Sequence, residues 1–240
     1  MTVMVQAETP ARIRELIERA VPMGAESFGM QFCKLLPEYR RPEVYRELFA
    51  ATHGLPVYAT NYRAAKNAGK SDEVLGRELV ELAECGAALC DVMGDFYAPV
   101  ADEFTSDPDA ARRQVELIDA IHKAGAKVLM SSHTHTESTP ERILEIALGQ
   151  QERGADVCKI VVKCETPERE LDYMRLIPVL REKLSIPVLF LCAGKACHLL
   201  RRTAGTIGNC MNLCVVEYDD LATTSQPLLS DMIALRELLE

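Results

Sequence analysis

Short apolar runs alternate with longer amphipathic stretches along the whole chain. A short run that is apolar at nearly every position is typical of a β-strand covered on both faces of a parallel sheet. A longer stretch with apolar residues at helical spacing predicts a helix with one buried face. We predict strands near residues 3–7, 25–32, 56–61, 89–93, 127–132, 157–162, 187–192 and 212–216. We predict helices near residues 10–21, 42–51, 71–85, 107–124, 139–153, 166–184, 198–203 and 230–239.

A threonine followed by a proline marks the start of three predicted helices, at Thr9, Thr139 and Thr166. A threonine side chain accepts a hydrogen bond from a free backbone N–H of the first helical turn. Proline is favoured at the first helical position because its fixed φ suits the helix and it has no N–H to satisfy. These dipeptides therefore predict where the helices begin.

Eight strands, each followed by a helix, fit a (β/α)8 barrel better than an open doubly wound sheet. No Gly-x-Gly-x-x-Gly fingerprint follows an early strand, so nothing indicates a dinucleotide site. The chain also has no linker, low-complexity segment or repeat of fixed period. We predict an α/β fold, a single TIM barrel, in one domain covering residues 1–240.

Composition and charge exclude several classes of partner. The chain has 240 residues, 48% of them hydrophobic, which suffices for a large core. Its net charge of −9 argues against nucleic acid and anionic membranes, which select for a basic face. No apolar run approaches the ~18–20 residues of a membrane span. We expect neither a nucleic-acid nor a membrane partner.

The nine cysteines do not form a disulfide pattern. They are odd in number and several lie in the predicted strands, at positions 33, 85, 90, 158, 164, 192, 197, 210 and 214. The chain opens directly into a strand pattern at Met1, without a signal sequence. We therefore expect reduced thiols and a cytoplasmic protein.

Lys159 is out of place for its surroundings, because it lies inside the apolar run Ala155-Asp-Val-Cys-Lys-Ile-Val-Val162. A lysine in a buried strand points into a polar cavity or loses its charge. An uncharged lysine amine attacks ketones and aldehydes to form a Schiff base. The alternative is a structural lysine paired with a carboxylate.

Other polar residues fall at the carboxyl ends of the predicted strands, where barrel active sites lie. His133 ends the fifth strand and would neighbour Lys159 on the sixth. Iminium formation acidifies the adjacent carbon, and an imidazole can then move the proton. Arg63, Lys195 and Arg201 could anchor a carboxylate or a phosphate on the substrate. This pattern indicates lyase or aldolase chemistry on a small carboxylated keto substrate.

Two further interpretations of the histidines remain open. His133 could be a hydrogen-bonded structural residue, and His133-x-His135 could form half of a metal site. No strong set of acidic residues and histidines accompanies this pair on the other strand ends. The cysteines also lack the close Cys-x-x-Cys pairs of structural zinc. We expect no metal and no cofactor.

At several ordered positions the chain resembles the type I 3-dehydroquinate dehydratase family. The matching segments are Lys127-Val-Leu-Met-Ser-Ser-His133 with Ser138-Thr-Pro140, Ala155-Asp-Val-Cys-Lys159-Ile, Phe190-Leu-Cys-Ala-Gly194, Arg201, Gly208 and Gln226. The resemblance spans nearly the whole chain, and the segments around His133 and Lys159 are the most specific. It implies a Schiff-base barrel enzyme that removes water from 3-dehydroquinate to give 3-dehydroshikimate.

The resemblance also implies roles for individual residues. Lys159 would be the Schiff-base lysine, His133 the general acid and base, and Arg201 the carboxylate-binding arginine. Four more residues fall where the family lines its pocket, namely Arg63, Glu26, Asp91 and Gln226.

The chain departs from the family pattern at residues that contact substrate or tune the histidine. Phe28 stands where the family has a pocket arginine, and Asn67 removes a carboxylate expected near the histidine. Met93 replaces an acidic residue, and the closing loop reads Ala222-Thr-Thr-Ser-Gln226. A buried polar group left without its partner costs about 1–3 kcal/mol, so these changes predict altered substrate recognition.

Three hypotheses follow from these residues. The first is a Schiff-base dehydratase acting on 3-dehydroquinate or a related hydroxyketo acid. The second is a class I aldolase or another Schiff-base lyase with an altered substrate. The third is a barrel descendant that uses a metal or has no catalytic activity. We also expect a homodimer.

Overall fold

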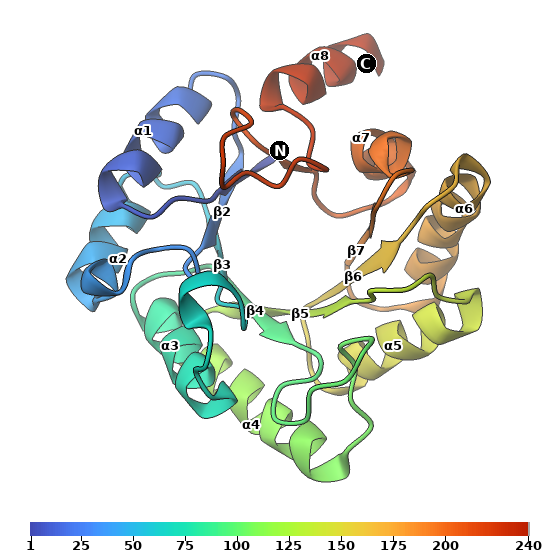
Figure 1. Ribbon diagram of the computed structural model, residues 1–240, viewed down its shortest axis with the longest axis horizontal. Coiled ribbons are helices and arrows are strands. Elements are labelled where there is room, and N and C mark those ends of the chain that lie inside the picture. Colours follow the sequence, from blue (N-terminus) through green and yellow to red (C-terminus); the bar gives the residue numbers. More distant parts are fainter. Residues whose placement is uncertain (240) are drawn as a thin grey trace. The chain divides into compact units, whose positions relative to one another are not determined.

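The computed structural model describes residues 1–239 and shows an α/β fold with eight β-strands paired in parallel (Figure 1). The strands are β1 (Thr2–Val5), β2 (Ser27–Gln31), β3 (Val57–Thr60), β4 (Leu89–Met93), β5 (Lys127–His133), β6 (Val157–Lys163), β7 (Val188–Ala193) and β8 (Leu213–Cys214). The helices are α1 (Pro10–Ala20), α2 (Pro42–Ala50), α3 (Asp72–Glu84), α4 (Pro108–Lys123), α5 (Pro140–Glu152), α6 (Pro167–Lys183), α7 (His198–Ile207) and α8 (Leu229–Leu239), with the 3-10 helices η1 (Pro37–Tyr39) and η2 (Ala65–Asn67). The predicted alternation of strands and helices is confirmed.

The three threonine-proline dipeptides begin helices as predicted. The side chains of Thr9, Thr139 and Thr166 each accept a hydrogen bond at 3.3 Å from the backbone N–H three residues later. Each cap satisfies one N–H that the first turn leaves without a helical partner. The polar cap residues therefore fix the first residue of α1, α5 and α6.

The chain divides into two compact units, which we describe separately. The first contains Met1–Asp91, Ile121–Ala126 and the chain from Leu213 onward, and the second contains Val92–Ala120 and Lys127–Asn212. Strand β4 has residues in both units. The single domain covering residues 1–240 stays a prediction.

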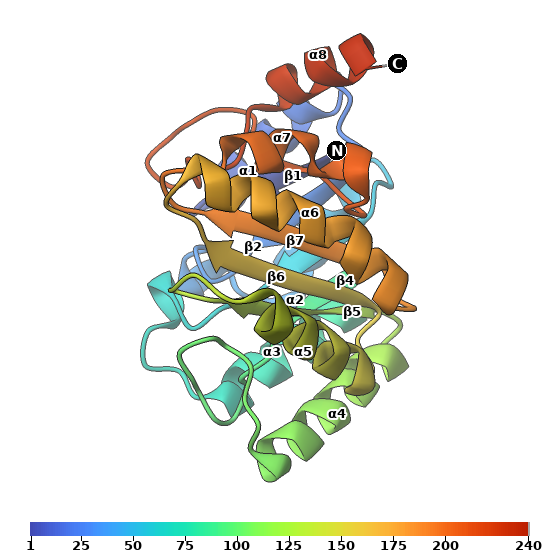
Figure 2. The ribbon, with the colours of Figure 1, turned by 90° about the vertical axis from the view of Figure 1, so that its right-hand side faces the viewer.

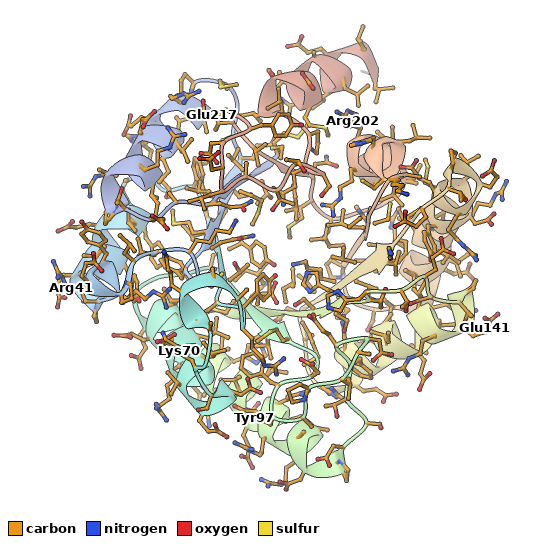
Figure 3. All side chains as sticks on the ribbon, viewed as in Figure 1. Arg41, Lys70, Tyr97, Glu141, Arg202 and Glu217 are labelled. Atoms are coloured by element: carbon orange, nitrogen blue, oxygen red, sulfur yellow. The ribbon has the colours of Figure 1, made fainter. Side chains whose placement is uncertain are left out.

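In the first unit the hydrogen-bonded strand order is β4-β3-β2-β1-β8. Figure 1 shows α1, α2 and α3 on the outer side of these strands. Their apolar faces are buried, with Ile17, Leu48 and Leu79 fully covered together with Phe28 of β2. Each such side chain contributes about 1.5–3 kcal/mol through burial. Arg41 lies at the outer margin, at the start of α2 (Figure 3).

The second unit contains β5, β6 and β7 in register. Ser131 lies opposite Lys159, and Lys159 lies opposite Leu189. Figure 2 shows α5 and α6 lying alongside β5, β6 and β7. Gln150 of α5 reaches the sheet and binds both backbone groups of Lys159, accepting from its N–H and donating to its carbonyl at 3.1 Å. This buried amide fixes α5 against β6.

Two further properties concern the chain as a whole. No helix among residues 1–239 combines the length and the apolar character needed to cross a membrane. All nine cysteines are free thiols, and only Cys210 is exposed.

Gly149 of α5 allows a close contact with the loop that follows β4. A Cβ at this position would overlap the ring of the buried Phe104, lying 2.8 Å from its Cε1. The ring in turn stacks under the guanidinium of Arg153, 4.0 Å from the ring centroid. Position 149 therefore requires glycine, because the Phe104 ring leaves no space for a side chain.

We expect Gly149→Ala to lower the free energy of unfolding by about 1–3 kcal/mol, the usual cost of overpacking a close contact. This cost exceeds the ~1 kcal/mol that alanine gains over glycine in a helix. Urea unfolding measures the change. In a Phe104→Leu protein the smaller side chain leaves room for the new Cβ, so Gly149→Ala should cost less stability there. The contact would be contradicted if Gly149→Ala were as stable as the wild type, or if it cost the same stability with Phe104 and with Leu at position 104.

Candidate active site

Lys159 lies in the middle of β6 with its side chain on the same face of the sheet as its neighbours in register. It is 5% exposed, and Ser131 of β5 lies directly opposite. Residues in register on parallel strands point to the same face, and successive residues alternate between faces. Lys159, Ser131 and His133 therefore share one face. This register supports the prediction that Lys159 and His133 lie close together.

Ser132 points to the opposite face and confirms the alternation. Its hydroxyl accepts a hydrogen bond at 3.0 Å from Gln150 Nε2 of α5. The helix side of the sheet is thus occupied by Ser132, and the other side carries Lys159 and His133. His133 lies two residues beyond Ser131, or about 7 Å further along the strand direction. One small molecule can contact both side chains.

Glu103, which the sequence analysis did not identify, binds His133. Its Oε2 lies 2.8 Å from His133 Nδ1 and accepts from the His133 backbone N–H at 3.0 Å. The pair is partly covered, with 29% of the histidine and 20% of the glutamate side chain exposed. Glu103 lies in the long loop between β4 and α4, where no hydrophobic pattern indicates its position.

Arg201 of α7 is a buried cation at the carboxyl end of β7. It is 6% exposed, and its Nε donates to the carbonyl of Cys192 at 2.7 Å. No carboxylate among the described residues of its unit lies within ion-pair distance. Burial lowers the pKa of this guanidinium, yet an arginine remains protonated in proteins. A buried charge without a counter-charge favours an anionic ligand.

The groups around Arg201 do not neutralise it. Burial raises the pKa values of the Cys192 and Cys197 thiols, which therefore stay protonated. The buried carboxylate of Glu170 accepts instead from Leu200 N–H in the first turn of α7, at 2.8 Å. Cys192 lies three residues beyond the partner of Lys159 on β7, or about 10 Å along the strand. A ketone with a carboxylate can span this distance.

In the first unit, Asp91 is buried and already bound by tyrosines. Its Oδ2 accepts from the hydroxyls of Tyr58 and, at 2.5 Å, Tyr62. Burial and then the charge of Asp91 raise the pKa of Tyr58, so this phenol stays a neutral donor. Asp91, predicted to line the pocket, is satisfied within its own unit.

Arg63, the second predicted pocket arginine, forms a two-pronged ion pair with Asp72 at the start of α3. The Arg63 Nε lies 2.7 Å from Asp72 Oδ1, and Nη2 lies 2.8 Å from Oδ2. Such bidentate pairs are among the strongest hydrogen bonds in proteins. A substrate carboxylate at Arg63 would have to compete with Asp72.

The position of Glu26 does not support the role expected for it. It precedes β2, at the amino end of the strand, whereas barrel sites lie at the carboxyl ends. Its side chain is 59% exposed and pairs with the amino terminus and with Arg236 of α8, at 3.1 Å. A role of Glu26 in substrate binding stays a prediction, which this position does not support.

Gln226 follows β8 and is 5% exposed, with a side-chain oxygen that has no hydrogen-bond partner among the described residues. A buried acceptor left unmet costs about 1–3 kcal/mol. Its backbone is fixed by a turn from Thr223, at 2.9 Å, and by Tyr218 Oη, which donates to its carbonyl at 3.0 Å. Gln226 therefore presents an acceptor suited to a ligand hydroxyl.

Residues 1–239 contain no group of three or more histidines, cysteines or acidic residues placed to hold a metal ion. His135, the second histidine of the possible metal half-site, is exposed.

Comparison with known proteins decides the family. The model of the type I 3-dehydroquinase family matches residues 45–239. The chain belongs to the type I 3-dehydroquinase family. This confirms the resemblance stated from the sequence.

Two curated relatives agree with this membership. A 3-dehydroquinate dehydratase of Klebsiella pneumoniae subsp. pneumoniae is 30% identical over 175 residues, covering 71% of this chain and 64% of the relative. A second, from Klebsiella pneumoniae strain 342, is 31% identical over 102 residues, or 42% of this chain and 41% of the relative. The chain thus spans less than two thirds of the curated relatives it matches.

Solved structures share the fold at lower identity. The 3-dehydroquinate dehydratase of Geobacillus kaustophilus HTA426 has a TM-score of 0.81 at 15% identity, covering 99% of this chain and 90% of that one. The type I enzyme of Clostridium difficile, solved with covalently modified comenic acid, has a TM-score of 0.81 at 16% identity over 99% and 91%. A deoxyribose phosphate aldolase of Aeropyrum pernix has a TM-score of 0.60 at 16% identity over 98% and 88%.

Asn67 explains one departure from the type I dehydroquinase pattern. It is buried and donates to Asn61 Oδ1 at 2.7 Å and to the Tyr62 carbonyl at 2.8 Å. Its own Oδ1 accepts from Arg40 Nη1. The position that the family uses for a carboxylate here holds the loop after β3 together.

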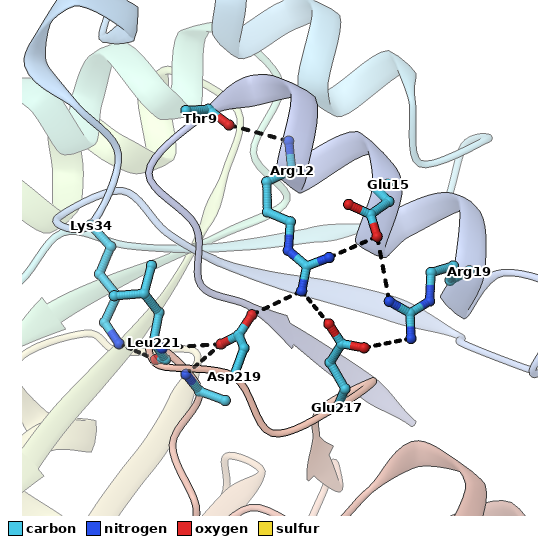
Figure 4. A network of polar contacts seen from close by, with 9 residues as sticks. Thr9, Arg12, Glu15, Arg19, Lys34, Glu217, Asp219 and Leu221 are labelled. Carbon is cyan, nitrogen blue, oxygen red and sulfur yellow. Dashed lines mark hydrogen bonds and ion pairs between the residues drawn. The ribbon is translucent and has the colours of Figure 1, made fainter.

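The loop between β8 and α8, which carries Gln226, is anchored by charged contacts (Figure 4). Glu217 binds Arg19 at 2.7 Å and also Arg12, which reaches Asp219 at 3.0 Å. Lys34 donates to the carbonyl of Leu221. The hydrogen bonds from Arg19 and then Arg12 lower the pKa of Glu217 to about 2.

We expect Glu217→Gln to destabilise the protein at neutral pH by up to about 1 kcal/mol, because the pair is partly exposed and screened. The folded carboxylate has the lower pKa, so its contribution is present above the unfolded value near 4.5 and disappears as the pH falls toward 2. Thermal unfolding between pH 2 and 7 measures the difference from wild type. Glu38→Gln, at an exposed position, is the control, and a pH-independent difference for Glu217→Gln would contradict the pairing.

Proposed function

We propose that this protein is a Schiff-base hydro-lyase that dehydrates 3-dehydroquinate or a closely related hydroxyketo acid. The observation that carries the proposal is the register of β5 and β6, which puts Lys159 and His133 on one face of the sheet. Membership of the type I 3-dehydroquinase family supplies the reaction class. The curated relatives carry the name 3-dehydroquinate dehydratase.

Lys159 begins the proposed reaction as a nucleophile. Its amine attacks the ketone carbon, the carbonyl oxygen leaves as water, and a protonated imine joins lysine and substrate. The positive nitrogen then withdraws electrons from the neighbouring carbon, whose proton becomes acidic. Burial of Lys159 in the middle of β6 excludes bulk water from this bond.

His133 would transfer the protons. Its neutral imidazole removes the proton next to the imine, and the electron pair expels the hydroxyl on the following carbon. The proton taken up by the ring leaves with that hydroxyl as water. Hydrolysis of the imine then consumes the water released when it formed and frees Lys159. The net change is the loss of one water from the substrate.

Arg201, in the same unit as Lys159 and His133, would orient the substrate. It is a buried cation without a carboxylate nearby among the described residues of its unit, and a substrate carboxylate would supply the counter-charge. Binding energy from this contact would hold the ketone against the amine. The role of Gln226, in the other unit, in binding a substrate hydroxyl stays a prediction.

A second candidate function is a Schiff-base lyase with a substrate other than 3-dehydroquinate. Arg63 is held by Asp72, and Asp91 is held by Tyr58 and Tyr62. Polar side chains already satisfied within the protein gain little from a substrate hydroxyl. This observation favours a substrate with fewer hydroxyls, and the Schiff-base step stays the same.

We also infer that the eight parallel strands belong to a closed (β/α)8 barrel. Support comes from the likeness to the Geobacillus kaustophilus dehydratase, which extends over 99% of this chain. A homodimer stays a prediction.

We expect sodium borohydride to trap a covalent adduct on Lys159 when 3-dehydroquinate is present, because it reduces the imine to a stable amine. Mass spectrometry of the intact protein and of its peptides shows the increment and its position. Lys159→Ala removes the nucleophile and should give no adduct.

Other outcomes separate the candidates. An adduct on Lys159 with other keto acids but not with 3-dehydroquinate would favour the second function. No adduct with any of these compounds would overturn both. His135→Ala should turn over substrate like the wild type, whereas equal losses in His133→Ala and His135→Ala would indicate a shared metal.

We expect Arg201→Gln to raise KM by about 10–100-fold, because a charged hydrogen bond is worth about 1.5–3 kcal/mol. Steady-state kinetics measures the change. Arg202→Gln is a matched control on the same helix, since Arg202 donates to the backbone carbonyl of His198 at 3.2 Å. Equal effects in the two variants would exclude a specific role for Arg201.

A further inference from the structure

We propose that Glu103 is the positioning residue of His133, taking over the task that the family pattern gives to position 67. Asn67 has no charge and is bound within its own unit. Glu103 reaches His133 from a different loop, between β4 and α4. The proposal rests on the proposed function, in which His133 carries protons, and it names the group that prepares the imidazole.

The contact defines the state of the imidazole ring. A carboxylate only accepts hydrogen bonds, so the ring nitrogen facing it, Nδ1, carries the proton. In a neutral ring the other nitrogen, Nε2, then carries no proton and has the lone pair of a base. The same Glu103 oxygen holds the His133 backbone N–H at 3.0 Å, which ties the carboxylate to the strand end. Glu103 thus sets both the tautomer and the orientation of the ring.

The loop around Glu103 is fixed on both sides by arginines of α5 and the residue after it. Arg142 binds the preceding residue, Asp102, with its Nε 2.9 Å from the carboxylate. Arg153 covers the ring of the following residue, Phe104, at 4.0 Å. Both anchors lie in the same unit as His133. The carboxylate is therefore held in place by its neighbours as well as by the histidine.

Two hydrogen bonds to backbone carbonyls join this loop to β5. The carbonyl of Glu103 accepts from the hydroxyl of Ser132 at 2.8 Å, and Gly94 N–H donates to the carbonyl of Ser131 at 2.7 Å. A Cβ on Gly94 would lie 2.9 Å from the Ser132 hydroxyl oxygen, so the loop passes too close for a side chain. The loop follows β5 directly up to His133.

Glu103 adopts a left-handed backbone conformation, with φ of 49°. This conformation costs a residue with a Cβ on the order of 1 kcal/mol, and glycine adopts it freely. A partly exposed contact between a carboxylate and a histidine returns only about 0–1 kcal/mol, even when the histidine is charged. Stability therefore gives little reason to have glutamate here, whereas control of His133 gives a direct one.

Replacement by glycine is the sharpest test, because Glu103→Gly removes the carboxylate and suits the backbone. We expect kcat for dehydration to fall by about 100-fold, as small misplacements of catalytic groups cause, with KM within about threefold. Glu103→Gln keeps an oxygen that accepts from Nδ1–H, so its kcat should be at least tenfold higher than that of Glu103→Gly. Glu141→Gln, on an exposed residue at the outer end of α5 (Figure 3), should match the wild type.

Nitrogen-15 NMR of the histidine ring, recorded without substrate, reports the tautomer directly. We expect Nδ1–H for His133 in wild type and Glu103→Gln, and a mixture with Nε2–H in Glu103→Gly. An unchanged tautomer together with unchanged kcat in Glu103→Gly would overturn the proposal.

The same measurements separate this proposal from the proposed function. A wild-type protein without turnover or borohydride adduct would refute the function. The tautomer change in Glu103→Gly would then still support the positioning of His133 by Glu103. Turnover by the wild type with equal kcat and tautomer in Glu103→Gly would refute the positioning and leave the function intact.

Discussion

The parallel pairing of β5 with β6 is the constraint on which the candidate site depends. Because Ser131 lies opposite Lys159, the lysine and His133 share a face, and a shift of one residue would turn one of them toward the helices. Gln150 reinforces this register by binding the backbone of Lys159 and the hydroxyl of Ser132 together. Backbone hydrogen bonding between the strands thus positions Lys159 and His133. Their side chains need few additional contacts to face one ligand.

Much of this arrangement could be predicted from the sequence, because its causes are local or periodic. Apolar runs and threonine-proline caps indicated the strands and the start of three helices, and a lysine in a buried run indicated the candidate nucleophile. Glu103 could not be predicted, since it lies 30 residues before its partner in a loop without periodicity. The pairing of Arg63 with Asp72 could not be predicted either. A motif identifies an arginine that could bind a substrate carboxylate, but it does not show which carboxylate of the protein already binds that arginine. The position of Glu26 just before β2 was also not predicted, because a motif does not show at which residue a strand begins.

The polar groups of the site fall into two classes with different consequences for specificity. Arg63, Asp91 and Asn67 have partners within the protein, so a ligand must displace them to gain a contact. Arg201 has no carboxylate within ion-pair distance among the described residues of its unit, and the side-chain oxygen of Gln226 has no hydrogen-bond partner among the described residues. In the proposed reaction, a substrate carboxylate would therefore contribute more to binding than the ring hydroxyls would. A covalent bond to Lys159 would compensate for few such contacts, because it would hold the substrate while the proton is moved.

Helix α5 and the residue after it support both reactive groups from one side. Gln150 binds the backbone of Lys159, while Gly149 and Arg153 seat Phe104, the neighbour of Glu103. The strand of Lys159 and the loop of Glu103 therefore share one support. A substitution that moves α5 would displace both of them, even though α5 contains neither Lys159 nor His133.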